Sequence, residues 1–249
     1  MSQAVNAPLR TAQEIIRDVR VMQASNGICY ATLGEVTLPS SEVERMVEAV
    51  PAAVAAALIR KAFYFVPLAI GDDEKTLIAE RFDDALIPQA TCHRDVASGD
   101  SQCVFISTRL LDDRFSVAFE FYIHVGHAFV EKAGISPEFA ELVWTQASGN
   151  VRGETSMDAF ELRKLALGDG ALRADEKAKS EYLATAFSDS IAIYLLSLCL
   201  DVDYYELRER EYPLLAPSAM AERLKKIAEL FPPGPKFEFR IVHRRRSPR

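Results

Sequence analysis

The feature that most constrains the fold is a long helical segment at 175–200, DEKAKSEYLATAFSDSIAIYLLSLCL. Apolar side chains stand on two sides of it, with Ala186 and Ile193 on one and Phe187 and Tyr194 on the other. A helix that is apolar on most faces has to be buried, so other elements must surround it. A chain of 249 residues with 49% hydrophobic content is long enough to provide that cover in one large core.

The rest of the chain reads as a mixture of helices and short strands. Periodicity and capping signals predict further helices over 10–24, 41–60 (bent or divided at Pro51), 75–87, 110–134, 136–148 and 217–231. Apolar or alternating runs predict strands within 29–38 and over 62–70, 103–108 and 236–242. With no internal repeat and no long interior linker, these elements predict a single helix-rich α+β domain with a small mixed β-sheet over 9–242. A disordered N-terminus at 1–8 and a basic disordered tail at 243–249 complete this prediction.

Composition narrows the classes of partner. The net charge of −7, from 29 Lys and Arg against 36 Asp and Glu, argues against a dedicated nucleic-acid binder. The first residues carry no basic and then apolar signal pattern, and no uninterrupted apolar run approaches the roughly 18 residues of a membrane helix. We therefore expect a soluble, cytoplasmic protein that binds neither nucleic acid nor membrane, and the sequence does not indicate its oligomeric state.

Four cysteines are too few for a disulfide framework in a chain of this length. Cys92 and Cys103 flank the polar stretch HRDVASGDSQ, which reads as a loop, and they could meet if its ends pair. Free thiols are the prediction, because nothing indicates export. A Cys/His metal set formed with His93 is the less favoured alternative.

The stretch FEFYIHVGHAFVEKAG at 119–134 carries the most chemistry. On a helix, Glu120, His124, His127 and Glu131 share one face, because they stand at i, i+4, i+7 and i+11. Two imidazoles at i and i+3 can share a metal, and carboxylates one turn away can bind it or orient the imidazoles. The stripe therefore indicates either a metal or acid–base face that lines a cleft, or the solvated side of an amphipathic helix.

Two segments resemble the zincin metallopeptidases. IHVGHA (123–128) is similar to their active-site motif HExxH, often written HELGHA, with His127 at the second histidine position. EYLATAFSDSIAIYLL (181–196) resembles the glutamate helix of the gluzincins, above all the lethal-factor-like branch, where a run of the type EFFAEAF supplies the third zinc ligand. The resemblance covers roughly 62–200. It implies a zincin-like fold, with Glu181 at the third ligand position.

The same alignment shows a degenerate HExxH motif. Ile123 stands where the first ligand histidine belongs, and His124 stands where the general-base glutamate belongs. Peptide hydrolysis by a zincin needs both, because zinc polarises the carbonyl and acidifies a water whose proton the glutamate takes. Thr185 also replaces the second acidic residue of the glutamate run. The resemblance therefore implies the fold more than the activity.

Three functions follow from these residues. The leading one is a catalytically impaired or inactive metallopeptidase homologue without a metal, its cleft kept to bind a polypeptide or protein partner. The second is an active metal-dependent hydrolase with non-standard zinc ligands His124, His127 and Glu181, in which Glu120 acts as a further ligand or base. The third is a structural or interaction protein unrelated to peptidases.

Asp189 interrupts the apolar half of the long helix and needs hydrogen-bond partners, either behind a cleft or within the core.

Overall fold

The apolar segment at 175–200 forms the central helix α8 (Glu176–Cys199) in the computed structural model, which describes residues 8–71, 75–168, 175–202, 204 and 212–242. From Ala186 to Cys199 every residue except Asp189 and Ser197 is buried. The prediction that other elements surround this helix is therefore confirmed.

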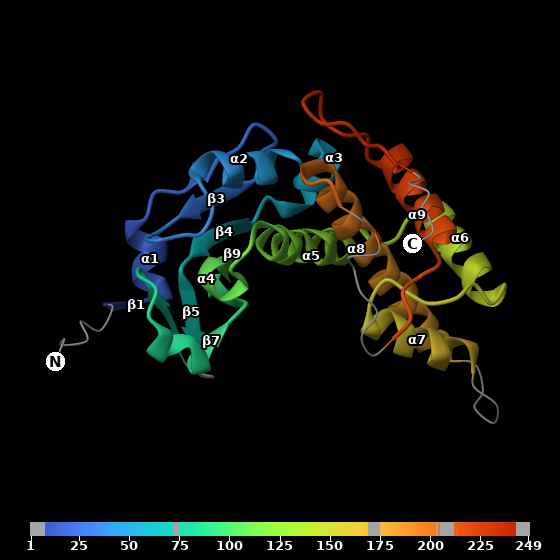
Figure 1. Cartoon of the computed structure of the whole chain (residues 1–249), viewed down its shortest axis with the longest axis horizontal. Coiled ribbons are helices and arrows are strands. Elements are labelled where there is room, and N and C mark those ends of the chain that lie inside the picture. The colour runs from blue at the N-terminus through green and yellow to red at the C-terminus, as the bar shows by residue number, and fades with distance from the viewer. Residues whose placement is uncertain (1–7, 72–74, 169–174, 203, 205–211, 243–249) are drawn as a thin grey trace, which may run out of the picture.

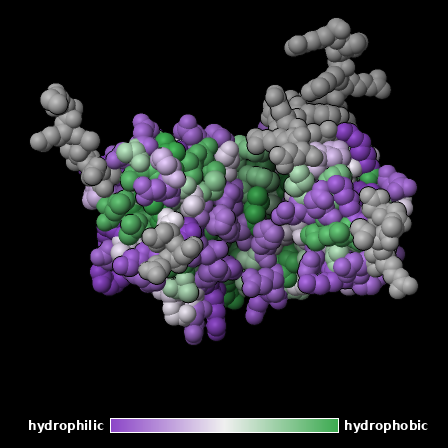
Figure 2. All heavy atoms as spheres, turned by 90° about the horizontal axis from the view of Figure 1, so that it is seen from below, coloured by the Kyte–Doolittle hydropathy of each residue, from purple (hydrophilic) through white to green (hydrophobic). Residues whose placement is uncertain are grey.

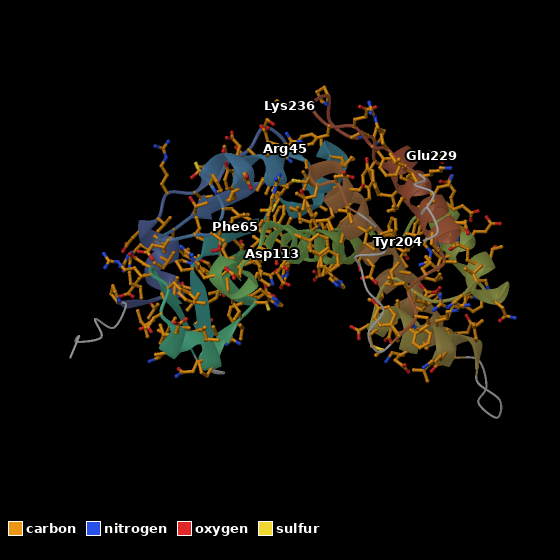
Figure 3. All side chains as sticks on the ribbon, viewed as in Figure 1. Arg45, Phe65, Asp113, Tyr204, Glu229 and Lys236 are labelled. Carbon is orange, nitrogen blue, oxygen red and sulfur yellow. The ribbon has the colours of Figure 1, made fainter. Side chains whose placement is uncertain are left out.

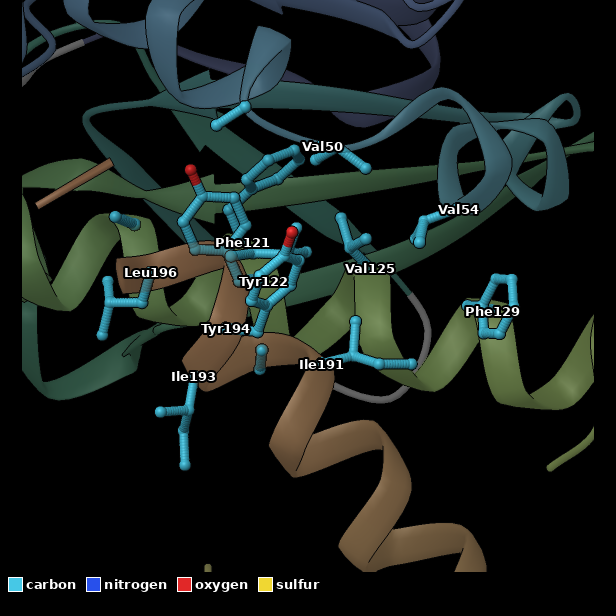
Figure 4. Close-up of a cluster of buried hydrophobic side chains, with 14 of the residues drawn as sticks. Val50, Val54, Phe121, Tyr122, Val125, Phe129, Ile191, Ile193, Tyr194 and Leu196 are labelled. Carbon is cyan, nitrogen blue, oxygen red and sulfur yellow. The ribbon is translucent and has the colours of Figure 1, made fainter. Parts of the chain in front are cut away.

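Four helices pack around α8. They are α5 (Arg114–Ala133), α6 (Pro137–Ser148), α7 (Met157–Leu167) and α9 (Pro217–Leu230). Figure 1 shows α5 spanning the middle of the molecule, from the half that holds the sheets to the half formed by α6, α7, α8 and α9. Figure 4 shows the contact between α5 and α8, where Phe121, Tyr122 and Val125 of α5 gather with Ile191 and Tyr194 of α8. Burial of these aromatic and branched side chains is the main force that joins the two halves.

The larger sheet has five strands in the order β2-β3-β4-β9-β8. Their bounds are β2 (Met22–Gln23), β3 (Cys29–Thr32), β4 (Lys61–Val66), β8 (His93–Ser98) and β9 (Ser101–Ser107). The inner strands β3, β4 and β9 are parallel, and β2 and β8 pair antiparallel at the two edges. The buried runs predicted over 62–70 and 103–108 are thus the centre of this sheet, as expected of strands covered on both faces.

Alternation along the strands divides the sheet into two packed faces. Phe63, Phe65, Val104 and Ile106 face the main core and α5, and Figure 3 shows Phe65 in its strand near the start of that helix at Asp113. The opposite face belongs to a smaller cluster with α1 (Ala12–Asp18). The helices α2 (Ser40–Glu48) and α3 (Ala52–Ala55), with a 3-10 turn at Ala56–Leu58, connect β3 to β4. The division of the predicted 41–60 helix at Pro51 is confirmed.

A second, four-stranded antiparallel sheet lies below the first in the order β1-β6-β5-β7. Its strands are β1 (Leu9–Thr11), β5 (Leu68–Gly71), β6 (Thr76–Ala79) and β7 (Ala90–Thr91). The short helix α4 (Thr108–Leu111) leads from β9 towards α5, and a 3-10 helix runs over Asp84–Gln89. The α+β class is confirmed, and it includes one sheet more than the sequence predicted.

Several predicted elements are wrong in detail. The helix predicted over 75–87 is instead the strand β6 and a 3-10 helix, because β6 pairs with β1 and β5 and this pairing overrides its helical periodicity. The helix over 10–24 is shortened to α1, because β1 and β2 occupy its ends. The strand over 62–70 is divided at Pro67, which cannot donate a ladder hydrogen bond. The polar stretch 93–98 is a strand rather than a loop, and α7 was not foreseen.

The predicted terminal strand at 236–242 is extended but has no strand partner among the described residues. Its apolar alternates Phe237, Phe239 and Ile241 pack on the main core instead. The guanidinium of Arg45 lies over the ring of Phe237 at 5.8 Å, and Figure 3 shows Arg45 and Lys236 on the same side of the molecule. The alternation of apolar and polar residues thus correctly predicted which side chains pack on the core, but the predicted pairing with another strand is absent from the described residues. The expectations for 1–7 and 243–249 lie outside the described residues.

By length and composition alone, α8 could cross a membrane, since its most apolar 18-residue window has a mean hydropathy of 1.4. In the folded chain 72% of that window is buried against other elements. The window is not an uninterrupted apolar run, because polar residues are interspersed in it. Burial of this kind is what the central helix of a helical core requires.

Candidate functional site

The site begins at a hairpin, in a stretch that was predicted to be a loop. β8 and β9 are joined by the two-residue turn Gly99-Asp100, in which Gly99 has a φ of 57°. His93 pairs with Ile106 and Asp95 pairs with Val104 across the two strands. Directly paired residues share a face of the sheet, so His93 and Asp95 stand on the face that α5 covers.

The second half of the site lies on α5. The carboxylate of Asp113 caps this helix by accepting from the N–H of Ser116 at 2.8 Å. Two turns further on, Glu120 and His124 stand at i and i+4 and face the hairpin. Oε1 of Glu120 lies 2.6 Å from Nδ1 of His93 and 3.5 Å from Nε2 of His124. The two imidazole rings meet edge to face, with centroids 4.2 Å apart.

The charges in this cluster reinforce one another. Burial raises the pKa of Glu120, but its contacts with His124 and His93 and the charges of these two imidazoles outweigh it and lower that pKa to about 2. In return, the hydrogen bond that Nδ1 of His93 donates to Glu120 raises the pKa of His93 above its usual value. The side chains of Glu120 and His124 are only 18% and 16% exposed, whereas that of His93 is 43% exposed. The cluster is therefore an ionised carboxylate under two imidazoles, open to solvent on the side of the strand.

Side-chain atoms of a kind that can bind a metal ion converge at this place. Ligand atoms of His93, Asp95 and His124 all lie within 4.8 Å of one another. Nε2 of His124 is buried and has no well-formed hydrogen bond to any described residue, because its contact with Glu120 is at the outer limit of length. A buried nitrogen without a partner is rare in folded proteins and calls for an explanation.

The predicted zinc set does not come together in the same way. Within the described part of the chain, His124, His127 and Glu181 do not form such a ligand group. His127 is exposed, and the carboxylate of Glu181 is also exposed, 3.6 Å from Nζ of Lys177. Of the predicted residues, the structure joins Glu120 to His124, and it adds His93 and Asp95.

The two helices that carry the resemblance do pack directly against each other. They cross at Gly126 of α5, where an added Cβ would lie 2.4 Å from the carbonyl oxygen of Ser188 in α8. Only glycine allows so close an approach of the two backbones. Glu181 precedes Ser188 by seven residues, which places it about 10 Å along the helix axis from the crossing. Ile123, at the first ligand position, packs against the main core.

Asp189 lies beside this crossing and finds a partner that the sequence did not indicate. Its Oδ2 accepts a hydrogen bond from Oγ1 of Thr155 at 2.8 Å. Burial raises its pKa, although hydrogen bonds from Ser156 and Thr155 and the charge of His127 oppose the rise. The hydroxyl of the neighbouring Ser190 donates to the carbonyl of Ala186 rather than to Asp189.

A fully buried ion cluster lies in the helical half and was also missed. Oε2 of Glu154 is 3.0 Å from Nη1 of Arg223, and Oε1 accepts from the hydroxyl of Tyr182 at 2.5 Å. Arg163 also donates to Oε1 of Glu154, at 3.3 Å. The Nε of Arg223 donates to Oε1 of Gln146 at 2.8 Å. This cluster ties a connector to α6, α7, α8 and α9.

The cysteines are all free thiols, as predicted. Cys92 is exposed, whereas Cys103 is buried opposite Val96 in the hairpin. Burial raises the pKa of both thiols, so neither is an activated nucleophile. The metal-binding atoms converge around His93 without either sulfur.

The signal for the hairpin was present in the sequence. The Gly-Asp dipeptide between HRDVAS and the apolar run of SQCVFIS is typical of a two-residue hairpin turn, and a strand over 93–98 places His93 and Asp95 on one face. Nothing local indicated that this face meets α5, because that contact depends on the order of the strands. No protein-family model, no curated protein and no solved structure matches this chain.

Proposed function

We propose that this chain is a catalytically impaired or inactive homologue of zinc metallopeptidases, whose scaffold is retained to bind a polypeptide or another protein partner. One observation carries the proposal: the side chains at the three ligand positions of the resemblance do not form a ligand group. Ile123 offers no donor atom, His127 points to solvent, and Glu181 pairs with a surface lysine. A zincin needs three protein ligands and a water on one metal.

The arrangement of the two helices supports the scaffold half of the proposal. A buried strand, β9, leads through a short helix into α5, and α5 crosses α8 at a glycine. The residues of the resemblance likewise predict a buried strand, then a short connector and then the helix that holds the two histidines. The small residue before His127 then has a structural reason, since Gly126 lets the backbones of α5 and α8 meet.

The shape of the molecule supports a binding role. Figure 2, seen from below, shows apolar side chains in a hollow at the middle of the molecule, with hydrophilic side chains beside them and further apolar patches on both halves. A hollow of this kind, apolar at its centre and polar at its rim, has the anatomy of a surface that binds a polypeptide. An active hydrolase with His124, His127 and Glu181 as ligands is less well supported, because His124 faces Glu120 and His93 instead.

The test uses a fluorescently labelled unstructured polypeptide and the full chain, with and without added Zn²⁺. We expect no cleavage in either condition, together with saturable binding seen as a change in fluorescence anisotropy. Zinc-dependent cleavage that disappears in His127→Ala or Glu181→Ala would contradict the proposal and favour the active hydrolase.

A matched control comes from the opposite side of the molecule. Lys236→Ala removes an exposed charge at the C-terminal segment and is expected to leave binding unchanged. Absence of both cleavage and binding would contradict the binding role and favour a structural protein unrelated to peptidases. Zinc-dependent cleavage that persists in both His127→Ala and Glu181→Ala would assign hydrolysis to other residues, and this too would contradict the proposal.

A further inference from the structure

We propose that His93, Asp95 and His124, with Glu120 beside them, form a site for a divalent transition-metal ion, and that Zn²⁺ fits it best. This site lies between the β8–β9 hairpin and α5, and it uses none of the ligand positions of the metallopeptidase resemblance. The proposal therefore stands on the geometry of the hairpin and does not depend on the function proposed above.

The geometry is close to that of a bound ion. Ligand atoms of His93, Asp95 and His124 lie within 4.8 Å of one another. Ligands of a tetrahedral zinc stand about 2.0–2.2 Å from the metal and so about 3.3 Å apart. The necessary closure is small, and Asp95 and His93 can provide it by rotation, because both side chains are exposed on an edge strand.

The backbone already fixes the approach of these groups. His93 and Asp95 are two residues apart on β8, so they project from the same face of the strand. His124 comes from the rigid middle of α5, where its neighbours Phe121, Tyr122 and Val125 are fully buried. A ligand set with one half on a helix and the other on a hairpin needs little ordering when the ion binds.

An unsatisfied atom points to an occupant. Nε2 of His124 is buried and lacks a well-formed hydrogen bond among the described residues. Glu120 serves it poorly, since its Oε1 lies 3.5 Å from Nε2, at the outer limit of hydrogen-bond length. A metal ion between the two imidazoles would satisfy Nε2 and would free Glu120 to bind as a fourth ligand or to orient a ligand histidine.

The chemistry of the donors selects the ion. Two imidazoles with one or two carboxylates suit Zn²⁺ and its neighbours in the first transition row, whereas Mg²⁺ and Ca²⁺ prefer sites made of oxygen alone. No sulfur of the described cysteines belongs to the group, which disfavours the soft ions that select thiolates. Exposure of His93 and Asp95 leaves one side of the site open to water.

The experiment is metal analysis of the full chain, followed by titration with zinc chloride in a calorimeter. We expect one Zn²⁺ per wild-type chain. His93 is exposed, so the His93→Ala variant is expected to fold. Its dissociation constant for Zn²⁺ should be at least about tenfold higher than that of the wild type, and Asp95→Asn should also raise it. Zinc should also raise the melting temperature of the wild type but not that of His93→Ala.

The matched control is His127→Ala, which removes an exposed histidine from the same helix one turn further on. It is expected to bind zinc as the wild type does. Zinc loss in His127→Ala but not in His93→Ala would overturn the proposal and move the metal to the positions of the resemblance. A wild type that binds less than about a tenth of an equivalent would also overturn it, and the cluster would then be an ion pair alone.

Discussion

The cluster around Glu154 and the cluster around Glu120 both centre on a glutamate, but their polar groups are satisfied to different degrees. In the helical half, both carboxylate oxygens of Glu154 are engaged, by Arg223 and Tyr182, and all three residues are fully buried. At the hairpin, one oxygen of Glu120 contacts both His93 and His124, and Nε2 of His124 is left poorly paired.

The difference separates a structural role from a functional one. A buried charge is tolerated only when every group around it is paired, and the Glu154 cluster meets that condition while it holds four helices together. The hairpin cluster is partly exposed to solvent, and Nε2 of His124 has no well-formed hydrogen bond to another described residue. We therefore assign stability to the first and ligand binding to the second.

The largest expected effect breaks the saturated cluster. Glu154→Gln leaves the buried Arg223 without its carboxylate partner, so the free energy of unfolding should fall by about 3–5 kcal/mol. Urea denaturation followed by circular dichroism measures it. A loss below about 1 kcal/mol would mean that the Glu154 cluster does not stabilise the helical half.

A smaller effect tests one hydrogen bond of the same cluster. Tyr182→Phe removes a donor to the ionised Glu154 and should cost about 1.5–3 kcal/mol. Tyr194→Phe is the matched control, because its hydroxyl donates to the neutral carbonyl of Phe231 and its loss should cost only about 0.5–1.5 kcal/mol. Equal costs for the two phenols would show that the charge of Glu154 adds nothing.

The smallest effect belongs to the open cluster and depends on pH. The raised pKa of His93 contributes stability below its unfolded value of about 6.5, and this is lost as pH rises through the folded pKa. The lowered pKa of Glu120 contributes stability above its unfolded value of about 4.3, and this is lost as pH falls towards 2. Between these limits both contributions are present.

Glu120→Gln, in a buffer with chelator, should therefore cost about 0.5–1 kcal/mol near pH 6 and clearly less at pH 8.5. The cost is small because His93 is 43% exposed and water screens the pair. In a His93→Ala background the pH dependence of this cost should largely vanish. A cost that grows between pH 6 and pH 8.5 would contradict the assigned ion pair.

The long helices could be predicted because their signals are local and strong. α5 ends at Gly134 with a φ of 74°, α6 begins with Pro137 after Ser136, and α8 follows the capping Asp175, all as the residues indicate. The central strands β4 and β9 could be predicted for the same reason, because each contains a continuous apolar run.

The remaining elements depend on partners that the sequence does not name. β6 has helical periodicity and becomes a strand because β1 and β5 lie beside it. β8 looks like a polar loop because it is an edge strand. Glu154 lies in a polar connector, where a surface position would be expected. It is buried because the fold brings Arg223, 69 positions later, into contact with it. The candidate site was therefore half predicted, through Glu120 and His124, while His93 and Asp95 required the sheet order.

A Co²⁺ titration followed by visible absorption, in the wild type, His93→Ala and His127→Ala, distinguishes the hairpin site from the ligand positions of the resemblance. We expect the intense bands of a tetrahedral site at one equivalent in the wild type and in His127→Ala, and their loss in His93→Ala. Bands that persist in His93→Ala and vanish in His127→Ala would contradict a metal site at the hairpin, as would a wild type that shows none.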